Sequence, residues 1–180
     1  MIPRPTDKAA LERLMKHFPV TAILGPRRCG KPTLAGELKA DHHFDLENPR
    51  DLALLAEPQL ALEDLSGLIV IDEIQRMPEL FPLLRYLVDT RKAQRYLILG
   101  SASQNLVRQS SESLAGRIAF HYLGGFRLTD VGLEYWRKLW MRGGLPPSFT
   151  AADDEAGFLW LEQYVATFLD RAIPQLGISI

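Results

Sequence analysis

The residues with the most informative chemistry run from Gly25 to Thr33, in the order Gly-Pro-Arg-Arg-Cys-Gly-Lys-Pro-Thr. A glycine, four further residues, Gly-Lys and then a hydroxyl residue form a loop whose backbone N–H groups converge on a polyphosphate. Gly25, Gly30 and Lys31 match this pattern, and Lys31 supplies a point charge for the terminal phosphates. The sequence therefore predicts a phosphate-binding loop, and the alternative is an ordinary Gly/Pro turn after a strand.

Pro32 stands where the pattern has serine or threonine. That hydroxyl normally coordinates Mg²⁺, and proline also lacks a backbone N–H for a phosphate oxygen. Proline disfavours the helical conformation in the preceding residue, so we expect Pro32 to bias Lys31 away from the helix. Thr33 is not expected to replace the ligand, because one step along a helix turns the side chain by about 100°. We expect impaired binding of Mg²⁺-nucleotide and slow or absent hydrolysis.

A pair of acids follows an apolar run, residues 68–71, which is typical of a strand buried on both faces. Asp72 and Glu73 come at its end, where ligands bind in open α/β sheets. We expect Asp72 to hold Mg²⁺, directly or through water, and Glu73 to orient and deprotonate the attacking water. The alternative is a surface acid pair after a strand, which the preceding phosphate loop disfavours.

Two other positions could contact a transferring phosphate. Ser101 and Ser103 follow the apolar residues 95–99, and a hydroxyl there could contact the γ-phosphate or the attacking water. Each serine could equally cap the next helix. Arg117 precedes the apolar residues 118–120 and could stabilise the phosphate, in its own subunit or in a neighbour's. A solvated or ion-paired arginine is the alternative.

Strands and helices alternate along the part of the chain that must position these residues. Such alternation predicts an α/β fold with a parallel sheet flanked by helices. We expect a core domain over residues 1–125 and a small helical, lid-like segment over 126–180. The expected helices are about 8–17, 33–39, 51–64, 79–90 and 105–109, then 128–141 and 155–170, and the expected strands are 20–24, 43–46, 68–72, 95–99 and 118–122.

The expected helix 155–170 carries apolar residues on one face. That face could pack on the core as a lid, or form a seam for a further region or a partner subunit. Three tryptophans also favour exposed apolar surface in this segment if that region is missing. The face contains Phe158, Leu161, Val165, Phe168 and Leu169, and the tryptophans are Trp136, Trp140 and Trp160.

The composition of the 180 residues is that of a globular protein, with 47% hydrophobic and 24% charged residues. A net charge of −1 gives no overall attraction to nucleic acid or to anionic membranes. No apolar stretch is long enough to span a membrane, and no signal peptide is evident. The single cysteine, Cys29, excludes an internal disulfide and suits the cytoplasm.

Together these motifs resemble the AAA-type ATPase domain of prokaryotic ATPases that carry a DUF4143 region. The resemblance rests on residues 25–31, 45–47, 70–75, 100–103 and 114–117 in that order, and extends from about Leu11 to about Gly177. It implies an additional-strand P-loop fold with a sensor strand between the two Walker strands. It also implies that residues 25–31 bind ATP, that Asp72 coordinates Mg²⁺, that Glu73 catalyses hydrolysis, that a residue near Ser101 senses phosphate, and that Arg117 faces it. The nucleotide-contacting residues are then Gly25, Pro26, Arg27, Arg28, Cys29, Gly30, Lys31 and Thr33.

Three departures from this family bear on function. The family has Thr or Ser where Pro32 stands and usually an acid where Ala172 stands, and similar proteins continue beyond Ile180 for roughly another domain's length. We therefore expect a truncated ATPase module that binds ATP and in which hydrolysis to ADP and phosphate is impaired. A non-catalytic interaction or scaffold module is the alternative function. A nucleic-acid-dependent ATPase is less favoured, because the loop itself accounts for Arg27 and Arg28.

Overall fold

The computed structural model describes residues 2–101 and 104–175, and the chain divides into two compact units. One unit is formed by residues 3–123, and the other begins at Gly124 and includes residue 2. In the first unit the strands are β1 (Val20–Leu24), β2 (His42–Asp45), β3 (Gly67–Asp72), β4 (Gln94–Gly100) and β5 (Ile118–Tyr122). Its helices are α1 (Pro5–His17), α2 (Lys31–Gly36), α3 (Pro49–Leu54), α4 (Pro58–Leu62), α5 (Leu80–Thr90) and α6 (Gln104–Ser113), with a short 3₁₀ helix η1 (Ile74–Arg76).

Within the described residues, the strands form one five-stranded sheet in the order β2-β3-β4-β1-β5. Every neighbouring pair is parallel. Strand β4 therefore lies between β1, which leads into the phosphate loop, and β3, which carries the acid pair. This confirms the predicted α/β fold with an added strand between the two strands that carry the site.

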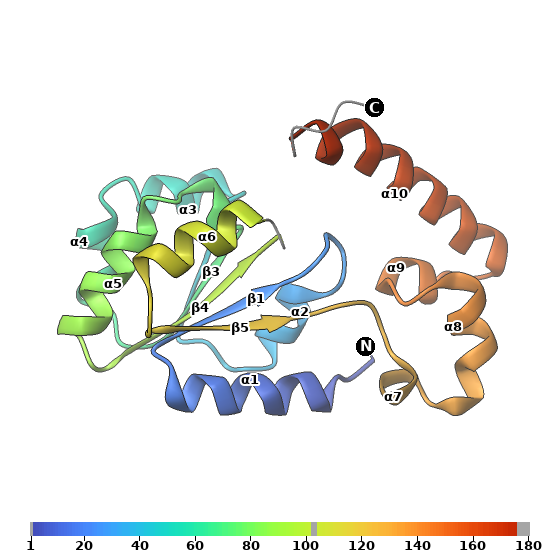
Figure 1. Cartoon of the computed structure of the whole chain (residues 1–180), viewed down its shortest axis with the longest axis horizontal. Coiled ribbons are helices and arrows are strands. Elements are labelled where there is room, and N and C mark those ends of the chain that lie inside the picture. Colours follow the sequence, from blue (N-terminus) through green and yellow to red (C-terminus); the bar gives the residue numbers. More distant parts are fainter. Residues whose placement is uncertain (1, 102–103, 176–180) are drawn as a thin grey trace. The chain divides into compact units, whose positions relative to one another are not determined.

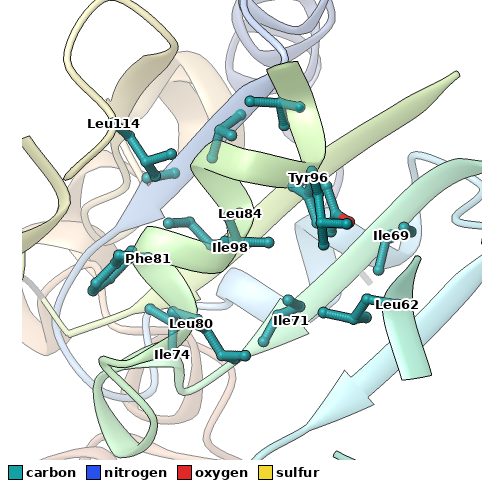
Figure 2. Packing of buried hydrophobic residues seen from close by; sticks show 14 of the residues in the cluster. Leu62, Ile69, Ile71, Ile74, Leu80, Phe81, Leu84, Tyr96, Ile98 and Leu114 are labelled. Atoms are coloured by element: carbon teal, nitrogen blue, oxygen red, sulfur yellow. The ribbon is translucent and has the colours of Figure 1, made fainter. Parts of the chain in front are cut away.

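The three central strands β1, β3 and β4 are buried on both faces because they are nearly continuous apolar runs. All five residues of β1 are buried. Figure 1 shows α5 and α6 over one face of the sheet and α1 over the other. On the α5 face, Phe81 and Leu84 pack with Ile71 and Ile98 from the central strands (Figure 2). The dense packing of α5 on the sheet fixes the strand ends that carry the candidate site.

Two predicted helices are interrupted, and the physical cause is local in each case. The predicted helix over 51–64 is two short helices, α3 and α4, because Pro49 and Pro58 each begin a new helix at its first residue. The predicted helix over 128–141 is broken at Gly132, which has φ of 95°. A positive φ terminates a right-handed helix and suits glycine.

The second unit is helical. It contains α7 (Leu128–Val131), a 3₁₀ helix η2 (Leu133–Tyr135), α8 (Trp136–Arg142), α9 (Pro146–Phe149) and α10 (Asp154–Gln175). The buried side chain of Ser148 donates to the carbonyl of Arg142, and Arg142 pairs with the exposed Asp154, so polar contacts join α8, α9 and α10. In the described part of the chain, no helix combines the length and the apolar character needed to cross a membrane.

Candidate phosphate-binding site

The loop of residues 25–30 connects the end of β1 to the start of α2, as the predicted motif requires. Gly25 is tightly packed, since a Cβ atom there would lie 2.2 Å from the carbonyl oxygen of Leu123. Gly30 has φ of 99° and Arg28 has φ of 64°, both in the left-handed region. Glycine tolerates that region without a Cβ penalty. Both motif glycines are thus required by the local backbone, Gly25 by close approach and Gly30 by conformation.

Lys31 lies under this loop with only 4% of its surface exposed. Its ammonium group donates to the carbonyl oxygens of Gly25, at 3.0 Å, and of Pro26, at 3.1 Å. The charge is therefore held at the centre of the loop by the loop's own backbone. A phosphate bound by the loop would lie close to this charge.

Pro32 leaves the helix intact. Helix α2 begins at Lys31, so the expected bias of Lys31 away from the helix is wrong. Pro32 is the second helical residue, where the helix needs no N–H donor. The first helical hydrogen bond runs from the N–H of Leu34 to the carbonyl of Gly30, at 3.0 Å. Both Pro32 and Thr33 are exposed. The first turn of α2 therefore accommodates Pro32.

The remaining loop side chains differ in exposure. Pro26, Arg27 and Arg28 are exposed, whereas Cys29 is buried. Burial raises the pKa of the Cys29 thiol, an effect that the positive charges of Lys31 and Arg4 oppose in part. The thiol is therefore neutral at physiological pH and acts as a small buried residue of the loop.

Asp72 is the last residue of β3 and is 7% exposed. Burial is the main reason that the pKa of its carboxyl group is raised, and the negative charges of Glu73 and Asp45 add to the effect. The N–H of Glu73, at 2.8 Å from Asp72 Oδ1, and the charge of Lys31 act in the opposite direction. The structure therefore brings Asp72 within electrostatic range of the loop lysine. A cation bound to phosphate there would offset the free-energy cost of burying the Asp72 carboxylate.

Glu73 follows β3 in a left-handed backbone conformation, with φ of 54° and ψ of 41°. A non-glycine residue in this region typically costs about 1–3 kcal/mol and is often found at functional sites. Its carboxylate accepts a hydrogen bond from the side-chain amide of Gln75 in η1. The side chain of Glu73 is thus held in one orientation beside the strand end.

Ser101 directly follows β4, between the ends of β1 and β3. Leu24 is in register with Gly100, and the N–H of Gly25 lies 3.4 Å from the carbonyl of Gly100. Ser101 therefore lies at the same edge of the sheet as the loop and the acid pair. Ser103, the other candidate, lies outside the described residues.

Arg117 lies at the opposite edge of the sheet. It precedes β5, and its carbonyl accepts from the N–H of Val20, the first residue of β1. A strand of five residues spans about 16 Å, so Arg117 is about that far from the loop edge. Its guanidinium instead donates to both carboxylate oxygens of Asp89, at 2.7 and 2.9 Å. In this structure Arg117 therefore lies away from the loop of its own chain, and its contact with a phosphate, which we predicted in its own subunit or in a neighbour's, stays a prediction.

The structure adds two residues that the analysis of the sequence left without a role. Asp45 ends β2 in register with Asp72, so a second carboxyl group lies beside the candidate metal ligand. Gln75 contacts Glu73 through its side chain. Asp45 could have been found from its place near the end of the expected strand 43–46, whereas the contact of Gln75 depends on the turn after β3.

Comparisons with known proteins identify relatives of the chain. Residues 17–131 match the model of a family described as an AAA domain, AAA_14. Uncharacterized proteins of Mycobacterium tuberculosis and Mycobacterium bovis are each 50% identical to the chain over 184 residues. The alignment covers 100% of this chain but 42% of each relative, so the chain spans less than half of their length.

Solved structures support the fold. A Walker-type ATPase of Pyrococcus abyssi superimposes with a TM-score of 0.68 at 16% identity, covering 98% of this chain and 75% of that protein. A signal transduction ATPase with numerous domains and a tetratricopeptide repeat sensor, from Pyrococcus horikoshii, gives a TM-score of 0.55 at 15% identity, covering 85% of this chain and 30% of that one. At these identities the likeness concerns the fold.

Proposed function

Because the chain belongs to the AAA domain family, we propose that it is an ATP-binding module of a prokaryotic DUF4143-type ATPase in which Pro32 impairs hydrolysis. The observation that carries this proposal is the buried ammonium of Lys31, enclosed by the carbonyls of Gly25 and Pro26. The direct hydrogen-bond partners of this ammonium group are neutral carbonyls, so its positive charge is available to a polyphosphate anion.

The residues present fit the phosphates of ATP better than they fit Mg²⁺. The loop supplies backbone N–H groups, Lys31 and the start of α2. Mg²⁺ in such sites is bound by one or two carboxylates, phosphate oxygens and water. Asp72 is the candidate carboxylate, and Pro32 removes the hydroxyl ligand. When bound, Mg²⁺ would neutralise phosphate charge during hydrolysis, and in this chain we expect that contribution to be weakened.

The protein residues have separate roles in this proposal. Lys31 and the backbone of residues 25–30 bind the phosphates, and Thr33 contacts the same ligand from the first turn of α2. Glu73 accepts a proton from the attacking water, and Ser101 orients the γ-phosphate from the end of β4. Arg117 would act on a neighbouring subunit's phosphate, so full activity would need an oligomer.

A non-catalytic scaffold is the second candidate function. Pro32 favours it, as do the exposed apolar side chains of the second unit, such as Leu133 and Trp140. Surfaces of this kind mark sites of protein association. In this version the nucleotide site is degenerate, and the helical segment binds a protein partner or a second copy of the chain.

Calorimetric titration of ATP, with and without Mg²⁺, tests both functions in this chain and in Pro32→Thr. We expect this chain to bind ATP with little dependence on Mg²⁺, and Pro32→Thr to bind tighter when Mg²⁺ is present. Binding by Pro32→Thr alone would favour the scaffold. Normal Mg²⁺-dependent turnover by the unchanged chain would contradict the proposed impairment.

A further inference from the structure

The carboxamide of Gln75 joins Glu73 to the end of the central strand β4. Its Nε2 donates to Glu73 Oε2, and its Oε1 faces Gly100, where a Cβ atom would lie 3.0 Å away. Ser101 is the next residue. One side chain therefore spans from the carboxylate after β3 to the end of β4.

The orientation of this amide follows from its neighbours. With Nε2 and Oε1 exchanged, an acceptor oxygen would face the carboxylate of Glu73, and two acceptors repel. The orientation with Nε2 on Glu73 leaves Oε1 buried, with no hydrogen-bond partner in the part of the chain that the structure describes. A buried polar atom without a partner destabilises a protein by about 1–3 kcal/mol.

Two locally unfavourable features thus occur two residues apart. Glu73 has a left-handed backbone, and Gln75 has a buried acceptor without a donor. Gln75 could be replaced by leucine, which has nearly the same size and no polar atoms, without leaving any buried polar atom of its own unpaired. Features that lower stability and lie beside a reacting group indicate a functional constraint.

We propose that Gln75 is a positioning residue that holds the carboxylate of Glu73 at a fixed place relative to the end of β4. This inference rests on the proposed function, because it assigns Gln75 a role in hydrolysis. The hydrogen bond from Nε2 selects one rotamer of Glu73. Packing of the amide against Gly100 fixes the position of Gln75, and so of the Glu73 carboxylate, relative to the end of β4 beside the phosphate loop. In this role Gln75 acts through Glu73 and not by a contact of its own with ATP.

The test is Gln75→Leu, made in Pro32→Thr so that hydrolysis can be measured. A positioning role predicts that kcat falls about tenfold or more, the loss typical of one hydrogen bond to a charged group. It also predicts unchanged ATP affinity by calorimetry, and unfolding in urea that is unchanged or needs more denaturant. A merely structural glutamine would instead lower stability and leave kcat unchanged.

Gln59→Leu is the matched control, because Gln59 also donates to a glutamate, Glu63, but from an exposed position on α4. We expect it to change neither kcat nor affinity. Equal kcat for Gln75→Leu and its parent would overturn the inference and leave the proposed function standing. If Pro32→Thr binds no ATP, the proposed function fails and the inference fails with it. If Pro32→Thr binds but does not hydrolyse ATP, a role of Gln75 in hydrolysis is likewise overturned.

Discussion

At Lys31, a buried ammonium group contacts two carbonyl oxygens of its own loop. These two hydrogen bonds hold the loop closed around the positive charge of Lys31. They also mean that phosphate oxygens would compete with backbone carbonyls for the same three N–H donors. We therefore expect the affinity for ATP to depend on Lys31 more than on the exposed Arg27 and Arg28.

Lys31→Ala is expected to weaken ATP binding by at least tenfold, because it removes the charge at the centre of the loop. It also leaves the carbonyls of Gly25 and Pro26 without this donor, so a loss of about 1 kcal/mol in stability is expected. Lys92→Ala is the matched control, since Lys92 also donates to a carbonyl, that of Val88, but away from the loop. Calorimetry with ATP checks the first effect, and equal affinities for the two variants would contradict it.

Gly25 and Gly36 flank the same stretch of chain but meet different surroundings. A Cβ at Gly25 would clash with the carbonyl of Leu123, whereas a Cβ at Gly36 would meet nothing within 4 Å. Gly25→Ala should therefore lower the free energy of unfolding by about 2 kcal/mol. Gly36→Ala should raise it by about 0.5–1 kcal/mol, because Gly36 is helical. Urea unfolding compares them, and similar stabilities would show that the loop is not packed as described.

Among the secondary-structure elements, β1 is the strand that positions the phosphate loop. It pairs with β4 on one side and β5 on the other, and all of its residues are buried. Its apolar side chains contribute to both faces of the sheet, so it fixes the start of the phosphate loop. One polar residue, Thr21, interrupts this apolar strand.

Thr21→Val is expected to stabilise the protein by about 1 kcal/mol. The hydroxyl of Thr21 is fully buried and, as far as the described residues show, has no hydrogen-bond partner. Valine has nearly the same shape and removes that unsatisfied group. Thr90→Val is the control, because the Thr90 hydroxyl donates to the carbonyl of Tyr86 at 2.8 Å. A loss of stability in Thr21→Val, measured by urea unfolding, would mean that the hydroxyl has a partner.

The pair Arg117–Asp89 ties the start of β5 to the end of α5. The hydrogen bond from Arg117 is the main cause that lowers the pKa of Asp89 below 3.8. Because the folded-state pKa lies below the unfolded one, the pair adds stability above pH 3.8 and loses it as the pH falls through the lower folded value. Arg117→Ala should therefore be slightly less stable than its parent at neutral pH and equal to it in acid.

Arg108→Ala is the comparison for this effect, since Arg108 and Glu112 form a longer exposed pair at 4.0 Å. Its stability should match the parent at every pH. Urea unfolding over a pH series measures both variants. A pH-independent difference for Arg117→Ala would show that the ion pair is not the source of its effect. Retention of full hydrolysis by Arg117→Ala in Pro32→Thr would remove the predicted role towards a neighbouring subunit.

On the scale of the whole molecule, the two units differ in how well they bury their apolar side chains. The first unit has a continuous core around α5 and the central strands. In the second unit, large apolar side chains remain exposed on η2, α8 and α10, and they include Leu133, Trp136, Trp140, Phe158, Val165 and Phe168. Exposed apolar side chains that gather into a patch mark sites of protein association, so these residues are the candidates for an interface in this unit.

Trp140→Glu is expected to reduce self-association of the chain without lowering its melting temperature. Trp140 is 83% exposed, so its loss removes little internal packing, whereas a charge on this surface opposes burial in an interface. Leu60→Glu is the control, because Leu60 is an exposed apolar residue of the first unit. Sedimentation velocity over a concentration series measures the effect. Equal association of both variants would argue against an interface at Trp140.

The sequence by itself determined the parallel sheet and the candidate loop, because apolar runs, glycines and acids at strand ends carry local signals. Strands β1 and β5 have the predicted bounds, and the loop, Asp72, Glu73 and Ser101 meet at one sheet edge. Tertiary structure alone decided the rest. Arg117 lies at the far edge because parallel strands place their starts together, and its partner Asp89 is 28 residues away in sequence. The contact of Gln75 with Glu73 depends on the left-handed backbone of Glu73. Glutamate rarely adopts that conformation, so the sequence does not predict it.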